Sequence, residues 1–143
     1  MVHRLTQAAF RDYDKLDPPS GAGRENLESV RVELRHNGGA LACLDGRPVG
    51  CLRLAPAPES LHVRRLAVEP AFQGQGVGRA LMRWAEDEAR RRGCPEVSVG
   101  VRTALPRNLR FYSRLGYEVV AEHRHPGYSH PTWVTMRKRV ASR

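Results

Sequence analysis

A glycine-rich segment near the middle of the chain has the residue types of an anion-binding turn. It reads Gln73-Gly74-Gln75-Gly76-Val77-Gly78-Arg79, with three glycines in five residues. Glycine lets the backbone turn tightly and come close to a ligand. A predicted helix over 76–92 follows, and the unpaired N–H groups and positive dipole end of its first turn point back at the segment. The combination favours binding of a pyrophosphate.

Other glycine-rich turns differ from this one in defined ways. A P-loop requires Gly-Lys-Ser/Thr, and the segment contains no lysine. A dinucleotide fingerprint has GxGxxG directly after a strand, whereas here the spacing is GxGxG and residues 69–72 intervene. A purely structural helix start, with no ligand, stays open as the alternative. Arg79 in the first helical turn would repel the positive dipole end unless an anion offsets it.

The strand that precedes the turn carries a shift in its hydrophobic phase. Residues 61–69 read LHVRRLAVE, in which Leu61 and Val63 alternate at odd positions and Leu66 and Val68 at even positions. Side chains of a strand alternate with a period of two, so the change requires a one-residue slip near Arg64-Arg65. We therefore expect a β-bulge there.

The remaining pattern predicts a mixed α/β fold. Asp45-Gly46-Arg47-Pro48 predicts a hairpin turn, and Pro56 and Pro58 predict a loop. The long helix should bury Leu81, Trp84, Ala85 and Ala89 and leave its charges outside. A right-handed crossover makes strands 61–69 and 96–101 parallel. The other expected elements are helices 24–36 and 107–115 and strands 40–44, 48–54, 117–124 and 132–139.

Composition bounds the function classes. The 143 residues fit one domain, 1–143, and contain no apolar run near the ~20 residues of a membrane span and no secretory leader, so we expect a cytoplasmic protein. The net charge of +9 favours anionic partners, but the arginines are spread along the chain, which makes nucleic acid an unlikely partner. Three cysteines without CxxC spacing predict neither a disulfide framework nor a metal site.

Two motifs in order carry a family resemblance. Gln73-x-x-Gly76-x-Gly78 follows the strand LAVEP, and Phe111-Tyr112-Ser113-Arg114-Leu115-Gly116-Tyr117 lies downstream. This pair resembles the GNAT superfamily of N-acetyltransferases over roughly residues 24–140. The resemblance implies a central mixed β-sheet flanked by helices, with splayed parallel strands at the site of acetyl-coenzyme A (acetyl-CoA), the co-substrate, and with no metal.

The resemblance also assigns cofactor contacts by position. It implies that the backbone of Leu66, Ala67 and Val68 binds the pantetheine arm as an added strand. The family often has an asparagine contact where this chain has Leu105, and Asn108, four residues before Tyr112, is either a cofactor contact or only a cap of its helix. The pyrophosphate would be held by the backbone N–H groups of Gln73, Gly74, Gln75, Gly76, Val77, Gly78 and Arg79.

The chemistry implied is direct attack of an amine on the thioester, with no acyl-enzyme. A backbone N–H near Val68 would polarise the carbonyl, and Tyr112 resembles the tyrosine that protonates the leaving thiolate and contacts the cofactor. A phenol with a pKa of ~10 suits that role. The general base stays open, and a water chain could replace it. The candidates are His62, Glu69, Glu25, His125 and His130.

The acceptor is a small-molecule or peptide amine, and by family analogy its site involves residues 18–25 and 124–131. Nothing in the sequence decides whether the chain forms a homodimer. Two other function classes remain: a non-catalytic CoA-binding sensor, and a basic nucleic-acid-binding domain. The first would bind CoA without turnover, and the second would bind DNA in a salt-sensitive way that CoA does not disturb.

Overall fold

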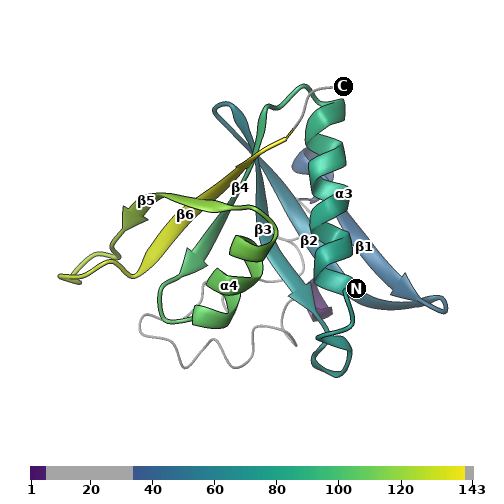
Figure 1. Ribbon diagram of the computed structural model, residues 1–143. Helices are drawn as coiled ribbons and strands as arrows, with labels where there is room; N and C mark the ends of the chain where they lie inside the picture. The colour runs from purple at the N-terminus through teal and green to yellow at the C-terminus, as the bar shows by residue number, and fades with distance from the viewer. Residues whose placement is uncertain (6–33, 141–143) are drawn as a thin grey trace.

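A computed structural model describes residues 1–5 and 34–140 of the chain. Within that part, a six-stranded sheet carries helices and one 3-10 turn, and residues 2–5 and 34–37 are short helical stretches (Figure 1). The elements are β1 (Gly39–Leu44), β2 (Arg47–Ala57), β3 (Ser60–Val68), η3 (Pro70–Phe72), α3 (Val77–Arg91), β4 (Glu96–Arg102), α4 (Pro106–Arg114), β5 (Glu118–His123) and β6 (Trp133–Arg139). The predicted mixed α/β fold is confirmed.

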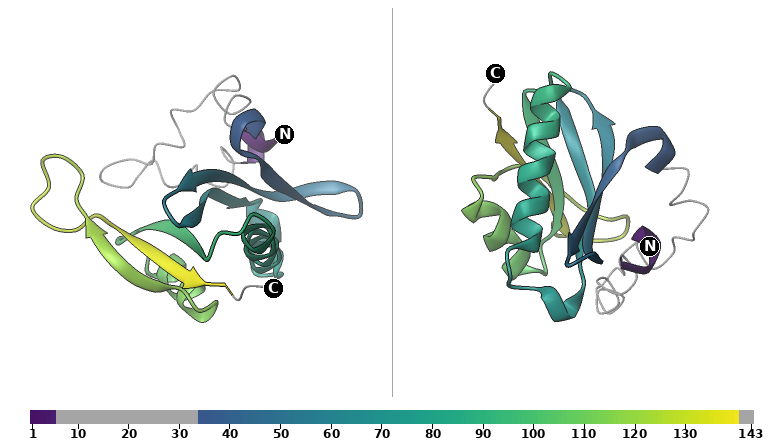
Figure 2. Two further views of the ribbon diagram at one scale, coloured as in Figure 1. Left: turned by 90° about the horizontal axis from the view of Figure 1, so that it is seen from above. Right: turned by 90° about the vertical axis from the view of Figure 1, so that its right-hand side faces the viewer.

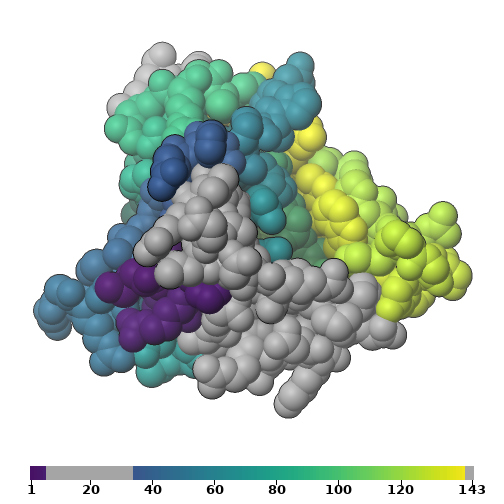
Figure 3. Space-filling model, turned by 180° about the vertical axis from the view of Figure 1, so that it is seen from behind, coloured from purple at the N-terminus to yellow at the C-terminus, as the bar shows by residue number. Residues whose placement is uncertain are grey.

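The strand order of the sheet is β1-β2-β3-β4-β6-β5. Only β3 and β4 are parallel, as the crossover through α3 predicts, and every other neighbouring pair is antiparallel. Both α3 and α4 lie on one side of the sheet, and residues 1–5 lie on the other (Figure 2). Figure 3 looks onto this second side, with residues 1–5 in purple and β6 in yellow.

The predicted bulge is present and coincides with the place where the sheet opens. The register of β2 on β3 shifts between Cys51 and Arg53, and Arg65 has a φ of 53°. The shift returns Leu66 and Val68 to the side of the main core, which Leu61 and Val63 also face. The β3–β4 pairing stops at Val63 and Val99, although β4 continues beside β6 to Arg102. The two parallel strands therefore splay, as the family resemblance implies.

The main core lies between α3 and the sheet. Leu81, Met82, Ala85 and Ala89 are buried there against the apolar side chains of the central strands. The expected helix face is confirmed at three of its four positions, whereas Trp84 is only half-buried against the core. Glu86, which the helical pattern places among the exposed charges, is buried instead. Its carboxylate is held by Tyr117 and Lys138, which come from elements distant in sequence.

The connections agree with the sequence in all but one place. Asp45 and Gly46 form the predicted tight turn, with φ values of 50° and 78°. Gly38, with a φ of 89°, follows the helical residues 34–37. The loop expected at Pro56 is wrong, because β2 continues to Ala57. Pro56 lies beyond the last residue of β2 that pairs with β1, Arg53, so its missing N–H interrupts no β1 ladder.

Most of the helix expected over 24–36 lies outside the described residues. In the part that is described, no helix is both long and apolar enough to cross a membrane.

Candidate functional site

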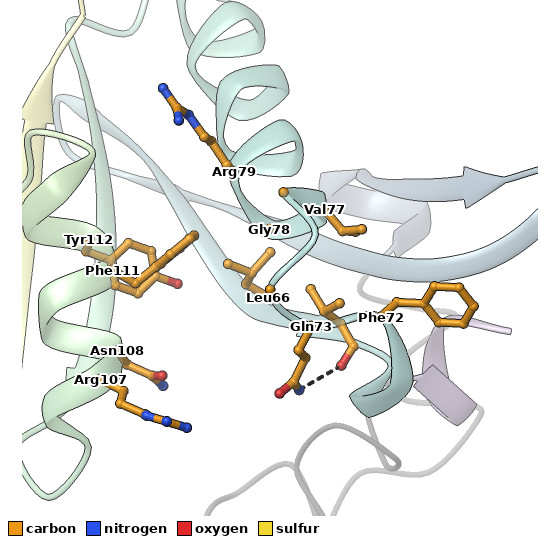
Figure 4. Close-up of a pocket in the computed structure, with 13 residues that line it drawn as sticks. Leu66, Phe72, Gln73, Val77, Gly78, Arg79, Arg107, Asn108, Phe111 and Tyr112 are labelled. Carbon is orange, nitrogen blue, oxygen red and sulfur yellow. Dashed lines mark hydrogen bonds between the residues drawn. The ribbon is translucent and has the colours of Figure 1, made fainter.

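A cavity of about 410 Å³ lies between the start of α3 and the side of α4 (Figure 4). It sits on the helix side of the sheet, beside the β3 residues that have parted from β4. The residues that line it are Leu66, Val68, Phe72, Gln73, Gly74, Gly76, Val77, Gly78, Arg79, Arg107, Asn108, Phe111 and Tyr112. Ten of these were expected at the cofactor site from sequence, so the fold brings most of the predicted residues together.

The glycine turn has the geometry of an open anion cradle. Gly74 and Gly76 have φ values of 81° and 86°, which L-residues with side chains rarely adopt, and no atom of residues 1–5 or 34–140 lies within 4 Å of where their Cβ atoms would be. Gly76 is the N-cap of α3, and no side chain caps the helix there. The first N–H groups of α3 therefore have no capping side chain, so they suit an anionic ligand.

Gly78 keeps the cavity open where α3 approaches α4. A Cβ atom at this position would lie 3.3 Å from Cζ of Phe111 and 3.8 Å from Cγ2 of Val68. Figure 4 shows Arg107, Asn108 and Tyr112 of α4 across the cavity from Gln73. The cavity is thus a slot between a glycine-lined helix start and a polar helix side.

The freed edge of β3 faces this slot. The N–H of Glu69 donates to the carbonyl of Val49 on β2 at 2.8 Å. Because backbone groups alternate along an antiparallel strand, the N–H and C=O of Val68 point away from β2, toward the gap left by β4. The Val68 carbonyl accepts a hydrogen bond from Nε2 of Gln73 at 3.1 Å. The side chain of Ala67 packs on the opposite side, against Leu5.

Tyr112 is held rigidly at the inner wall. It is 9% exposed, and its ring packs edge-on against Phe111 and Tyr117 with centroids 5.0 and 5.8 Å away. Edge-to-face contacts of this kind restrict the ring and add stability beyond burial. Asn108 lies one helical turn earlier and also lines the cavity, whereas Leu105 is the N-cap of α4.

His62 lies on the other side of the sheet from this cavity, just before the strands splay. Its Nδ1 is 2.9 Å from Oγ of Ser98, which is 3.1 Å from Oγ of Ser60. The pKa of His62 is lowered from its usual 6.5 by burial, and further by the positive charges of Arg64 and Arg137. At neutral pH its imidazole is therefore uncharged and able to accept a proton.

The other candidate bases are placed differently. Glu69 is outside the cavity lining, and its carboxylate is paired with Arg47 at 2.9 Å. The imidazole of His125 is hydrogen-bonded to Thr132, and burial followed by Arg102 lowers its pKa. The ring of His130 contacts Tyr128 in the same loop. Glu25 and the expected acceptor segment 18–25 lie outside the described residues.

Three lining residues were not selected from the sequence: Phe72, Arg107 and Phe111. Phe111 belongs to the second motif, where its neighbour Tyr112 drew attention instead. Arg107 gave no local signal, because an arginine in the first turn of a helix resembles any solvated charge. Gln75 was expected at the site but is exposed and does not line the cavity. Among residues 1–5 and 34–140, no group of three His, Cys, Asp or Glu side chains is arranged to hold a metal.

Comparison with known proteins agrees with the motifs. The model of the acetyltransferase (GNAT) family matches residues 2–117. The acetyltransferase Atu2258 of Agrobacterium fabrum is 42% identical over 57 residues, which are 40% of this chain and 40% of that protein. The matched stretch thus spans less than half of the curated relative.

Solved structures share the fold. Ard1 from Thermoplasma volcanium superposes with a TM-score of 0.75 at 18% identity, over 99% of this chain and 95% of that one. A GNAT family acetyltransferase from Elizabethkingia anophelis, solved with acetyl-CoA bound, gives 0.67 at 18% identity over 80% and 84%. With the family match covering most of its length, the chain belongs to the acetyltransferase (GNAT) family of enzymes.

Proposed function

We propose that this protein is an acetyl-CoA-dependent N-acetyltransferase in which an amine attacks the thioester directly in a ternary complex. The observation that carries the proposal is the splay of β3 from β4 beside the open glycine turn of α3. A strand edge and a helix start meet there at one cavity. These are the features needed to hold an extended arm that ends in a pyrophosphate.

The residues of the cavity fit the donor by their chemistry. The turn 73–79 offers backbone N–H groups to the pyrophosphate, and Arg79 and Arg107 add positive charge to the lining. The freed edge of β3 at Leu66 to Val68 offers backbone groups to the pantetheine arm. When bound, acetyl-CoA supplies the acetyl thioester.

The chain then supplies positioning and proton transfer. Holding both substrates in register accounts for a large part of the acceleration. The N–H of Val68 donates to the thioester carbonyl oxygen, the N–C bond forms as the C–S bond breaks, and Tyr112 gives its proton to the departing sulfur. The proton lost by the amine goes to His62, directly or through water. The ion pair of Glu69 with Arg47 makes Glu69 the weaker candidate for this role.

The first test is thermal unfolding with acetyl-CoA, using NADH and ATP as controls. A ligand at 100 times its dissociation constant stabilises by ~2.7 kcal/mol, hence by a few degrees at this size. We expect a rise with acetyl-CoA alone. No rise would contradict the proposal, and a rise without turnover on a broad amine panel would indicate a CoA-binding protein that does not catalyse.

A variant pair links the rise to this cavity. Gly78→Glu places a carboxylate in the lining, where it repels the phosphates, although an acid in the first turn suits the helix dipole. The control Ala80→Glu adds the same charge to an exposed site in the same turn, outside the lining. We expect the first variant to abolish the acetyl-CoA shift and the second to keep it. Equal shifts in both would place the donor elsewhere.

A further inference from the structure

A row of polar side chains crosses three strands on the side of the sheet away from α3. His62 on β3 pairs in register with Ser98 on β4, and Ser98 pairs with Arg137 on β6. Val97, Val99 and Met136 point the other way into the main core, so the alternation of strands places this row on the opposite side. The row lies immediately before the point at which β3 and β4 separate.

The row is rich in positive charge. Arg64 follows His62 by two residues on β3, so it faces the same side past the end of the β3–β4 pairing. Both Arg64 and Arg137 lower the pKa of His62, which places their charges near the imidazole. The hydroxyl of Ser98 is already engaged by His62 and Ser60. Arg64 and Arg137 thus lie near His62, at the end of the β3–β4 pairing.

Arg137 has hydrogen-bonding capacity that the described residues leave unused. Its Nε is buried and has no hydrogen-bond partner within residues 1–5 and 34–140. Two carboxylates of the described strands share this side: Glu118, the register partner of Arg137 on β5, and Glu96, paired in register with Arg139. Neither forms an ion pair with Arg137 in that part of the chain. A buried guanidinium donor without a partner is costly, and an anionic ligand would relieve that cost.

One position beside these groups carries no side chain. Gly100 follows Ser98 on the same side of β4, and among the described residues a Cβ atom there would contact the Trp133 ring alone, at 3.6 Å. The glycine thus adds no side chain to this face of β4 one step beyond the row, where β3 no longer pairs with β4. A small ligand that contacts Arg137 would lie next to His62 and close to the point at which β3 and β4 separate.

We infer that the acceptor is an amine that also carries a carboxylate, and that Arg137 binds this carboxylate while the amine lies at His62. The inference rests on the proposed acetyltransferase function. Arginine suits the role because its planar fork matches a carboxylate with two parallel hydrogen bonds. The positive row correspondingly disfavours polyamines and other polycations. Arg137 is a specificity residue, and the reaction chemistry stays with the groups already assigned.

The test compares acceptors that differ only in the carboxylate. Free amino acids are assayed against their amides with saturating acetyl-CoA, by release of the CoA thiol, alongside phosphoethanolamine and spermine. We expect turnover of one or more amino acids and at least 10-fold lower kcat/KM for the matching amide. Equal rates for the amide, or a preference for spermine, would overturn the inference. Turnover of phosphoethanolamine alone would assign a phosphate and refute the carboxylate.

Variants of Arg137 test whether this residue causes the preference for amino acids over their amides. Above pH 7.5, where His62 is neutral, Arg137→Gln should lower kcat/KM for the amino acid by about 10- to 100-fold, mainly through KM, and change that of the amide far less. Arg137→Lys keeps the charge but loses the fork, so we expect an intermediate loss. The control Arg139→Gln removes an exposed charge two residues along β6 and should change neither substrate. Equal losses on acid and amide in Arg137→Gln would contradict the specificity role.

The acetyl-CoA melting shift separates this inference from the function on which it depends. If acetyl-CoA does not raise the melting temperature of the unmodified protein, the acetyltransferase proposal itself is contradicted. A retained shift with turnover of other amines, or with no turnover of any carboxylate-bearing acceptor, would overturn only the acceptor class.

Discussion

The two sides of the sheet use polar groups in opposite ways. On the α3 side, Glu86 is 8% exposed but accepts from the Tyr117 hydroxyl at 2.9 Å and from Nζ of Lys138 at 3.0 Å. On the other side, Arg137 keeps a buried Nε with no partner among the described residues. Paired buried groups stabilise a fold, whereas unsatisfied ones point to a ligand. The comparison teaches that the buried carboxylate on the α3 side has its hydrogen bonds within the fold, whereas the buried Nε of Arg137 on the other side remains available to a ligand.

The largest expected effect is on catalysis by Tyr112, which lines the cavity on the α3 side of the sheet. Tyr112→Phe removes the proposed acid but keeps the ring that packs on Phe111 and Tyr117. We expect kcat to fall by about 10²- to 10⁴-fold, the usual range for a general acid. The acetyl-CoA melting shift should stay intact. Turnover equal to that of the unmodified protein would remove Tyr112 from the mechanism.

The next effect tests whether Glu86 serves stability alone. Glu86→Ala leaves the Tyr117 hydroxyl and the Lys138 ammonium without their shared acceptor, and we expect a loss of about 2–4 kcal/mol in urea unfolding. Glu88→Ala on the same helix breaks only ion pairs with the exposed Arg91 and Arg92, and should cost less than about 1 kcal/mol. Similar losses of unfolding free energy in the two variants would show that the buried carboxylate of Glu86 stabilises the fold no more than an exposed one.

The same glycine-to-alanine substitution can be compared on the two sides of the sheet, at Gly50 and at Gly100. A Cβ atom at Gly50, on the α3 side, would lie 2.9 Å from Val77 and 3.1 Å from the carbonyl of Ala67, whereas at Gly100 the nearest atoms are at 3.6 Å. Gly50→Ala should destabilise by about 1–3 kcal/mol through overpacking. Gly100→Ala should be neutral or stabilise by up to about 1 kcal/mol. Thermal unfolding of both variants measures the contrast, and an equal cost would contradict it.

The smallest effect is the pH dependence of His62. Its folded pKa lies below 6.5, so the stability that neutral His62 contributes is present above pH 6.5 and is lost as the pH falls through the folded value. Activity should fall over the same acidic range as the base becomes protonated. His62→Asn should reduce the acid loss of stability, measured by urea unfolding between pH 7.5 and 5.

The pH dependence also tests whether Arg137 acts on the pKa of His62 within the row. Arg137→Gln removes one of the charges that lower the pKa of His62, so the acid limb of the rate profile should move to higher pH. Arg139→Gln is the control and should leave the profile in place. An unmoved limb in Arg137→Gln would show that His62 does not govern the rate.

Local sequence patterns were sufficient to predict most helices and strands and most residues of the proposed acetyl-CoA cavity. The bulge follows from the change of phase between Val63 and Leu66, because a strand has a fixed period of two. The glycine turn was recognisable because positive φ values and an uncapped helix start both require particular residue types at neighbouring positions. Most of the cavity lining was therefore predictable from two short motifs.

Cross-strand and helix-to-strand contacts were not predictable in this way. Glu86 has the sequence context of a solvated helix charge, and only Lys138, 52 residues later, and Tyr117 explain its burial. The row of His62, Ser98 and Arg137 depends on the register of three strands separated by a helix and a long connection. Arg107 and Phe72 line one cavity for the same reason, because α4 and the turn after β3 are distant in sequence.

By itself, then, the sequence determined the order and kind of the elements, the glycine turn, the bulge and the family, because each depends on residues close together in the chain. Only the tertiary structure decided where β3 and β4 separate, that the carboxylate of Glu86 is buried, and that the Nε of Arg137 is buried with no partner among the described residues. Those properties depend on strand register and packing, which sum interactions between distant segments that no local pattern encodes.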